Sequence, residues 1–209
     1  MDTVAASESP STWQPPRRSH PRTAGWWRRI TGRWLRRPTR PLLDLHAFLD
    51  EGAGLMAGTS RLVTLLVFDF EELDELRKLY GEDIRRAAVH QVGAALQSLA
   101  AGRGLAAHTG PARFALLLKG FTHDEAMVTV FGALGTPCRF EMEADGGEVI
   151  LVPDVVAGEC SRQPGALAKL HDSLAGRVQE DRHLRQAREQ HLRRARERYI
   201  SRPSDLQSR

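Results

Sequence analysis

The sequence has no long apolar run, only two cysteines and few aromatic residues. No window approaches the roughly 18 consecutive apolar residues that a membrane-spanning helix needs. The first residues also lack the apolar centre of a secretion signal, so we expect the chain to stay in the cytoplasm. Cys138 and Cys160 form no CxxC pair and have no His/Cys cluster around them, which predicts two reduced thiols and neither a disulfide nor a metal site.

Lysine is rare and arginine is common, and the charges are unevenly distributed along the 209 residues. Residues 1–40 carry nine arginines against two acids, and residues 177–209 carry ten arginines against five acids. Residues 41–176 carry 11 basic and 19 acidic side chains, a net charge of −8. An apolar content of 41% suits one globular domain with tails. The sequence therefore predicts an acidic domain between two basic ends.

The basic N-terminal end divides into two predicted parts. Residues 1–23 are rich in Ser, Pro and Arg and predict a disordered tail. Residues 24–41 predict a basic amphipathic segment with a tryptophan-rich face. Three occupants of that face stay open: the chain's own domain, an anionic membrane surface, and a protein partner; nucleic acid is the least favoured. The candidate interaction residues are Trp26, Trp27, Arg28, Arg29, Ile30 and Trp34.

Two strong apolar runs predict the centre of the domain. Leu62–Phe68 ends on Asp69, and Phe114–Leu118 follows a turn at 109–113. Apolar residues at helical spacing predict helices over 42–57, 71–79, 82–100 and 122–132. Alternation over 138–143, the Asp145-Gly146-Gly147 turn and Val149–Val152 together predict a second hairpin.

The C-terminal end predicts two helical stretches and a tail at 201–209. A helix at about 164–176 closes the domain, and residues 177–200 form a charged helix. Oppositely charged side chains four residues apart support this charged helix: Asp181, Arg185, Glu189, Arg193 and Glu197. Its apolar face is thin, which favours a helix projecting into solvent over the alternative, a homodimer contact through this helix.

The order and spacing of three motifs resemble the GGDEF family of diguanylate cyclases. Leu65–Leu73 resembles the family's strand ending in D-x-D-x-F, and Tyr80-Gly81-Glu82 is similar to its Y-G-H. The third motif, Gly110-Pro111-Ala112-Arg113-Phe114, stands where the family has G-G-D/E-E-F. The resemblance covers about 42–176 and implies an α+β fold, an α/β sandwich of the nucleotide-cyclase palm type with a central mixed sheet flanked by helices. It places Val149–Val152 as a later core strand.

The resemblance also implies a chemistry whose residues are replaced in this chain. Family members join two GTP molecules into cyclic di-GMP with two divalent metals that carboxylates hold. Asp69 is the one metal-binding acid that remains, because Ala112 and Arg113 stand where the family has acids. Arg113 places a positive charge where a cation should bind, and Pro111 removes a backbone N–H. We expect Asp69 to pair with Arg113 and expect no metal or cofactor.

The nucleotide-reading positions differ as well. Arg77 and Lys78 stand where the family has its guanine-reading Asn and Asp, Asp74 replaces a lysine, and the inhibitory R-x-x-D is absent from 101–104. The prediction is a catalytically inactive GGDEF-like domain, not an enzyme, that serves as a regulatory or protein-interaction module in cyclic di-GMP-related signalling. The alternatives are a peripheral protein that docks at the inner membrane or on a partner through its tryptophan-rich segment, and a residual binder of GTP or cyclic di-GMP without turnover.

Overall fold

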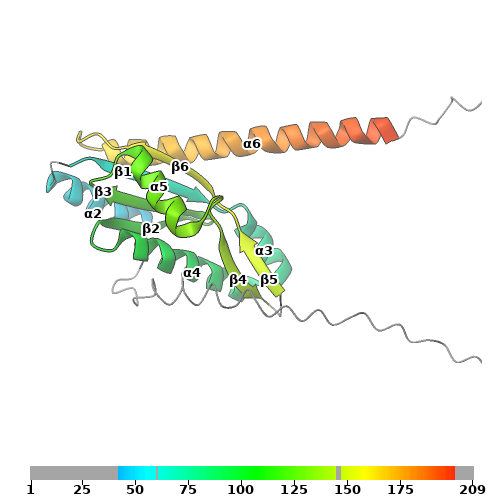
Figure 1. Cartoon of the computed structure of the whole chain (residues 1–209), viewed down its shortest axis with the longest axis horizontal. Coiled ribbons are helices and arrows are strands. Elements are labelled where there is room, and N and C mark those ends of the chain that lie inside the picture. The colour runs from blue at the N-terminus through cyan, green and yellow to red at the C-terminus, as the bar shows by residue number, and fades with distance from the viewer. Residues whose placement is uncertain (1–41, 60, 145–146, 201–209) are drawn as a thin grey trace, which may run out of the picture. The chain divides into compact units, whose positions relative to one another are not determined.

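The central strand of the domain is β1 (Val63–Asp69), whose seven residues are all buried. A computed structural model gives the fold and describes residues 42–59, 61–144 and 147–200 (Figure 1). These residues belong to one compact unit, Leu35–Arg209. The predictions for residues 1–41, including the tryptophan-rich segment, and for the tail at 201–209 lie outside the described residues. Within the described ranges, no helix is both long and apolar enough to cross a bilayer.

β1 lies inside a four-stranded sheet of order β2-β3-β1-β6. Each neighbouring pair in this sheet is antiparallel, so the predicted α+β class holds with an antiparallel sheet in place of a mixed one. A parallel contact occurs in the described chain as the isolated bridge between Leu43 and Ala107. The other three strands are β2 (Gly104–Gly110), β3 (Arg113–Lys119) and β6 (Asp154–Glu159).

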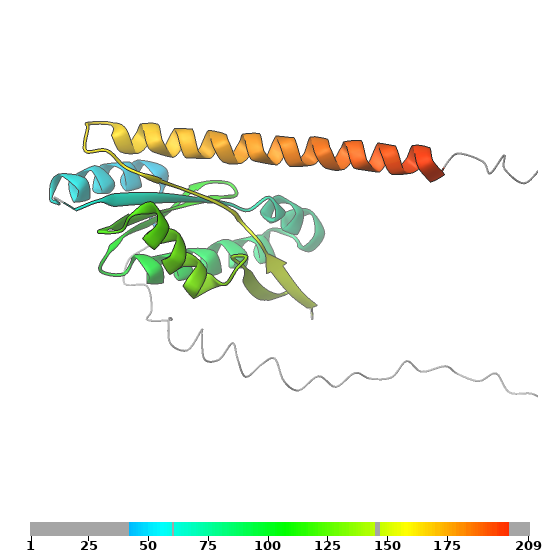
Figure 2. The ribbon, with the colours of Figure 1, turned by 45° about the horizontal axis from the view of Figure 1, so that its top comes forward.

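The pleat of β1 divides the core into two layers, because successive side chains point to opposite faces of a sheet. Leu66 and Phe68 pack with the helices α3, α4 and α5, while Leu65 and Val67 pack with α2 and α6. Figure 2 shows α6 and α2 on one side of the sheet, with α4 and α5 on the other. The helices are α2 (Leu45–Ala57), α3 (Glu72–Tyr80), α4 (Glu82–Ala100), α5 (His123–Leu134) and α6 (Ala166–Ile200).

The predicted core strand at Val149–Val152 is wrong. This stretch forms β5 (Gly147–Leu151), which pairs with β4 (Phe140–Ala144) in a separate two-stranded sheet, and Ile150 is 48% exposed. The later strand that joins the central sheet is β6, which follows β5 along the chain and pairs with β1 on the side opposite β3. Its sequence follows a proline and contains a glycine, Gly158, both of which weaken a strand pattern. α6 lies close to Gly158: a Cβ there would come 3.0 Å from Leu170 Cδ1, a tight contact that the leucine side chain would have to relieve.

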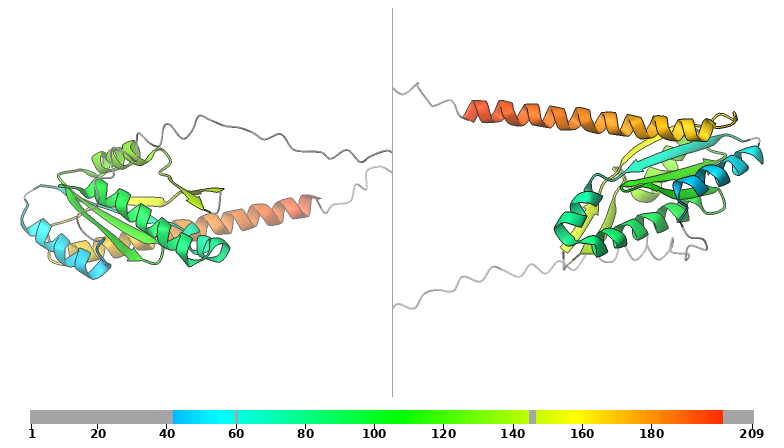
Figure 3. Two further views of the ribbon diagram at one scale, coloured as in Figure 1. Left: turned by 90° about the horizontal axis from the view of Figure 1, so that it is seen from below. Right: turned by 180° about the vertical axis from the view of Figure 1, so that it is seen from behind.

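The two helical stretches predicted at 164–176 and 177–200 form one continuous helix. α6 has 35 residues, which at 1.5 Å per residue gives a length of about 52 Å. Its first turns contribute Leu167, Leu174 and Val178 to the core. Its later turns run on past the sheet (Figures 1 and 3). The division between a domain at 42–176 and a separate charged helix stays a prediction.

Candidate functional site

Asp69, the last residue of β1, lies at the centre of the candidate site. It follows Leu65 and Val67 in the alternation of the strand and so points to the side of the sheet that α6 covers. Its backbone lies opposite Arg113 of β3 and Asp154 of β6. The Asp69 side chain is only 3% exposed. A carboxylate so deeply buried is stable in its charged form only when ion pairs or hydrogen bonds replace water.

The β2–β3 hairpin brings Arg113 to this carboxylate. Gly110 pairs with Arg113, so Pro111 and Ala112 form a two-residue connection. The Phe70 N–H donates to the Ala112 carbonyl over 2.8 Å, and Arg85 of α4 donates to the Pro111 carbonyl over 2.7 Å. These contacts fix the corner of the hairpin. Arg113 Nη2 then lies 3.2 Å from Asp69 Oδ2, which confirms the expected ion pair.

A second arginine, which the sequence analysis missed, binds the other carboxylate oxygen. Arg182 Nη2 of α6 donates to Asp69 Oδ1 over 2.6 Å. The same guanidinium reaches Glu71, with Nε 3.3 Å from Oε2. Arg182 is four residues after Val178, so it continues the stripe of α6 that packs on the sheet. That spacing was the available signal, but the sequence analysis did not use it and placed residues 177–200 in a helix that projects into solvent.

Two further contacts attach α6 beside Arg182. Gln186 Nε2 donates to Glu71 Oε1 over 2.6 Å, and Arg185 forms an ion pair with Asp154 at the start of β6. We call Arg182, Arg185 and Gln186 the α6 clamp. The three acids that the clamp binds, Asp69, Glu71 and Asp154, come from the end of β1, the start of α3 and the start of β6.

This arrangement neutralises Asp69 with fixed protein charges. Each of its two oxygens accepts a hydrogen bond from a different guanidinium, and bonds of this charged kind are stronger than those between neutral groups. The Arg113 and Arg182 side chains are themselves only 22% and 20% exposed. Both groups therefore occupy the space beside the carboxylate, and a metal ion bound to Asp69 would have to displace a guanidinium.

The other predicted positions do not join this cluster. Arg77 and Lys78 are exposed on α3, and within the described chain no hydrogen bond or ion pair links them to Asp69 or Arg113. Phe114 is a core residue, with its ring centroid 5.5 Å from that of Phe70. Cys138 and Cys160 are free thiols, and burial raises the pKa of Cys138 to about 12. Among the described residues, no group of three or more His, Cys, Asp or Glu side chains is placed to hold a metal ion.

Glu72 is a further carboxylate at this end of the sheet, and we predict that it destabilises the fold at neutral pH. Burial chiefly raises its pKa, aided by the negative charges of Glu71 and Asp154, while backbone N–H groups oppose the shift. Because the folded pKa is raised, the folded state binds the extra proton, and stability is lost as pH rises through that pKa. Glu72→Gln should therefore raise the free energy of unfolding at pH 7.

Urea unfolding of Glu72→Gln and of the unsubstituted protein, at pH 7 and again near pH 4, measures this effect. The gain at pH 7 should shrink at the lower pH, where the wild-type carboxyl takes up its proton. The exposed Glu75→Gln on the same helix is the matched control and should show little change at either pH. A Glu72→Gln protein that is less stable at pH 7 would contradict the interpretation.

Comparison with known proteins shows which solved structures share the fold of this chain. No family model matches the chain, and no curated protein matches it. Solved structures do match. The GGDEF domain of FimX from Pseudomonas aeruginosa is 18% identical with a TM-score of 0.54, over 66% of this chain and 90% of that one. The GGDEF domain of DgcB from Caulobacter crescentus, in complex with c-di-GMP, is 16% identical with a TM-score of 0.56, over 68% and 84%.

The chain has the fold of a GGDEF domain. A third match of the same fold is the diguanylate cyclase SiaD in complex with its activator SiaC from Pseudomonas aeruginosa, 13% identical with a TM-score of 0.57, over 76% of this chain and 65% of that one. Identities this low show the fold alone. In this chain, the described end of β1 carries an aspartate bound by two arginines, one from the hairpin and one from α6.

Proposed function

We propose that this GGDEF-like domain does not turn over GTP and works as an interaction or regulatory module in cyclic di-GMP-related signalling. The observation that carries the proposal is the double ion pair of Asp69. The resemblance assigns this position a metal-binding role, and two guanidinium groups compete directly with a divalent cation for the same two oxygens. Turnover of GTP would depend on metal ions bound by carboxylates, and in this cluster both oxygens of Asp69 are already paired with arginines.

The residues of the β2–β3 hairpin also support a domain without turnover. Ala112 offers no ligand atom, and Arg113 is committed to Asp69. The Pro111 carbonyl accepts a hydrogen bond from Arg85, which restrains the turn further. The fold is retained while the side chains at the turn serve to hold the structure together. A module of this kind acts through what it binds.

A protein is the partner that we propose. SiaD, which shares this fold, is described in complex with a protein activator, so the fold has a precedent for protein regulation. We propose that the protein acts in the cytoplasm. The basic tryptophan-rich segment at residues 24–37 supports the alternative of a peripheral position at the inner membrane, where its arginines would meet anionic lipid.

Incubation of the purified 209-residue chain with GTP and either magnesium or manganese tests the proposal. Chromatography of the products should show no cyclic di-GMP above a mock preparation. A parallel incubation with an active diguanylate cyclase shows that the assay detects the product. Cyclic di-GMP formed in proportion to the amount of this protein would refute the proposal.

A further inference from the structure

The side chains through which α6 contacts the domain change from apolar to polar along the helix. Leu174 and Val178 pack on the sheet, but the next two positions of the same stripe are Arg182 and Gln186. The change occurs beside the acidic residue that ends β1, Asp69, and the one that begins β6, Asp154. Over the next two turns, hydrogen bonds and ion pairs of Arg182, Arg185 and Gln186 hold the helix against the domain. From residue 187 to residue 194 every side chain is exposed, so the clamp includes the last partly buried side chain in the described part of the helix, Gln186.

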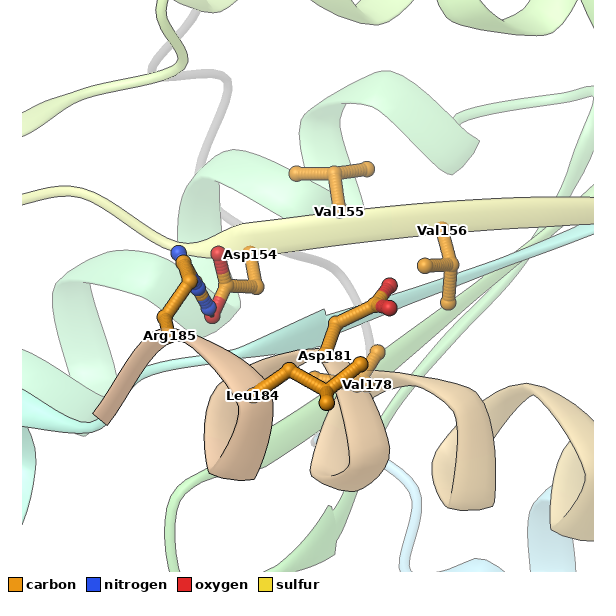
Figure 4. Close-up of a pocket in the computed structure, with 7 residues that line it drawn as sticks. All are labelled: Asp154, Val155, Val156, Val178, Asp181, Leu184 and Arg185. Atoms are coloured by element: carbon orange, nitrogen blue, oxygen red, sulfur yellow. Dashed lines mark hydrogen bonds and ion pairs between the residues drawn. The ribbon is translucent and has the colours of Figure 1, made fainter. Parts of the chain in front are cut away.

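A groove beside the clamp shows that apolar packing has already ended there. A cavity of about 400 Å³ separates β6 from α6 between Val178 and Arg185. In Figure 4, Asp181 and Leu184 of α6 face β6 across this space, with Val156 on the strand. Leu184 is 69% exposed although it lines the groove. Little apolar area would be lost if the helix lifted from this point onward, because little is buried.

The surface beneath the clamp is acidic. Lifting Arg182 and Arg185 would leave Asp69, Glu71 and Asp154 with Arg113 as the nearest partner that remains. Three carboxylates against one guanidinium select a cationic ligand. The geometry of the present occupant gives further detail: Arg182 bridges two of the acids, Arg185 takes the third, and both come from one helical turn with Gln186 beside them. We call this acidic surface the helix seat.

We propose that the helix seat is a docking surface for an arginine-bearing helix, which α6 fills within its own chain and which a basic helix of a partner protein fills when α6 lifts. The exchange is balanced in charge, because one set of guanidinium groups replaces another. It goes beyond the proposed function in naming the kind of partner, and it rests on that function only in assuming that the module acts by binding. The contacts are partly exposed ion pairs, so added salt weakens both docked states.

A peptide of this chain's own sequence tests the exchange. The probe is a synthetic peptide of residues 177–200, titrated into the 209-residue chain and into its variant Arg182→Ala/Arg185→Ala/Gln186→Ala. The variant should bind the peptide at least about tenfold more tightly than the unsubstituted protein, whose seat is filled, a difference of about 1.4 kcal/mol. The difference should shrink as salt is raised. A peptide carrying the same three alanines should bind neither protein.

Matched variants separate lifting of the helix from other effects. Arg188→Ala/Arg196→Ala removes the same amount of charge from exposed positions beyond the clamp and should behave like the unsubstituted protein. Hydrogen exchange should show that amides at 179–186 lose protection in the clamp variant only. If the triple variant does not fold, Arg182→Gln/Arg185→Gln, which keeps Gln186, takes its place.

The outcomes divide plainly. Tighter binding of the peptide by the clamp variant supports the helix seat. Equal binding by both proteins, binding of the alanine-substituted peptide, or binding by neither overturns it. Preferential binding of anionic vesicles or nucleic acid by the clamp variant in place of the peptide also overturns it, because an acidic seat should repel both. Cyclic di-GMP made from GTP by either protein would defeat the proposed function and leave the peptide result standing.

Discussion

Asp69→Asn should lower the free energy of unfolding by about 3 kcal/mol, because it removes one member of a buried ion cluster and leaves the other charges unpaired. The Asp69 side chain is 3% exposed, so water cannot replace it as a partner for Arg113 and Arg182. The two guanidinium groups would also face each other without the intervening negative charge. Each keeps about a fifth of its surface exposed, which places the cost at the low end for a broken buried pair.

Equilibrium urea unfolding at pH 7 measures the loss, and Asp154→Asn is the matched control. Asp154 also forms an ion pair with an α6 arginine, but the two side chains are 30% and 54% exposed. Exposed pairs of this kind contribute about 1 kcal/mol or less. Similar losses for the two variants would mean that Asp69 is no more important than a surface carboxylate, and the account of a site held together by two arginines would be wrong.

Gly104→Ala should destabilise the domain by about 3 kcal/mol, the upper end of the usual cost of an added methyl group that the backbone cannot accommodate. A Cβ at Gly104 would come 1.7 Å from the Leu117 carbonyl oxygen and 2.8 Å from its carbon. Both are backbone atoms of β3, so no side chain can rotate away to make room. The pairing of β2 with β3 at Gly104–Leu118 would have to open.

Thermal and urea unfolding of Gly104→Ala should be compared with Gly132→Ala. Gly132 is exposed inside α5, and a Cβ there would meet nothing within 4 Å. Alanine in a helix interior is favoured over glycine by roughly 0.5–1 kcal/mol, so this control should gain stability. A Gly104→Ala protein as stable as the unsubstituted chain would contradict the described approach of β2 to β3.

The sequence allowed most of the fold to be predicted because local and long-range patterns agree. Within the run Leu62–Phe68, residues 63–68 are buried on both faces of the sheet, so its continuous apolar character was a sufficient signal for β1. The helix expected at 82–100 is α4 with the same bounds. β6 was missed because its six residues include charged ends and a glycine, and its place in the sheet depends on pairing with β1, which lies far away in the sequence.

The candidate site was only half predictable for a related reason. The pairing of Arg113 with Asp69 was expected from the resemblance, which places Arg113 where the family has an acid, and the two residues do lie opposite each other on β3 and β1. Arg182 is 113 residues from Asp69, and its own neighbourhood is a run of charges that favours a solvated helix. What places it is the packing of Leu174 and Val178, which fixes the direction in which α6 leaves the sheet. Contact between two elements so distant in sequence is decided by packing, and the charge pattern alone does not show it.

A double-mutant cycle between Asp69 and Arg182 tests the central claim most directly. The free energies of unfolding of the unsubstituted chain, Asp69→Asn, Arg182→Met and the double variant give the coupling between the two side chains. Because they are in contact through a bond of 2.6 Å, the account predicts a coupling of at least about 1 kcal/mol. Losses that simply add, to within about 0.5 kcal/mol, would show that α6 does not hold the end of β1.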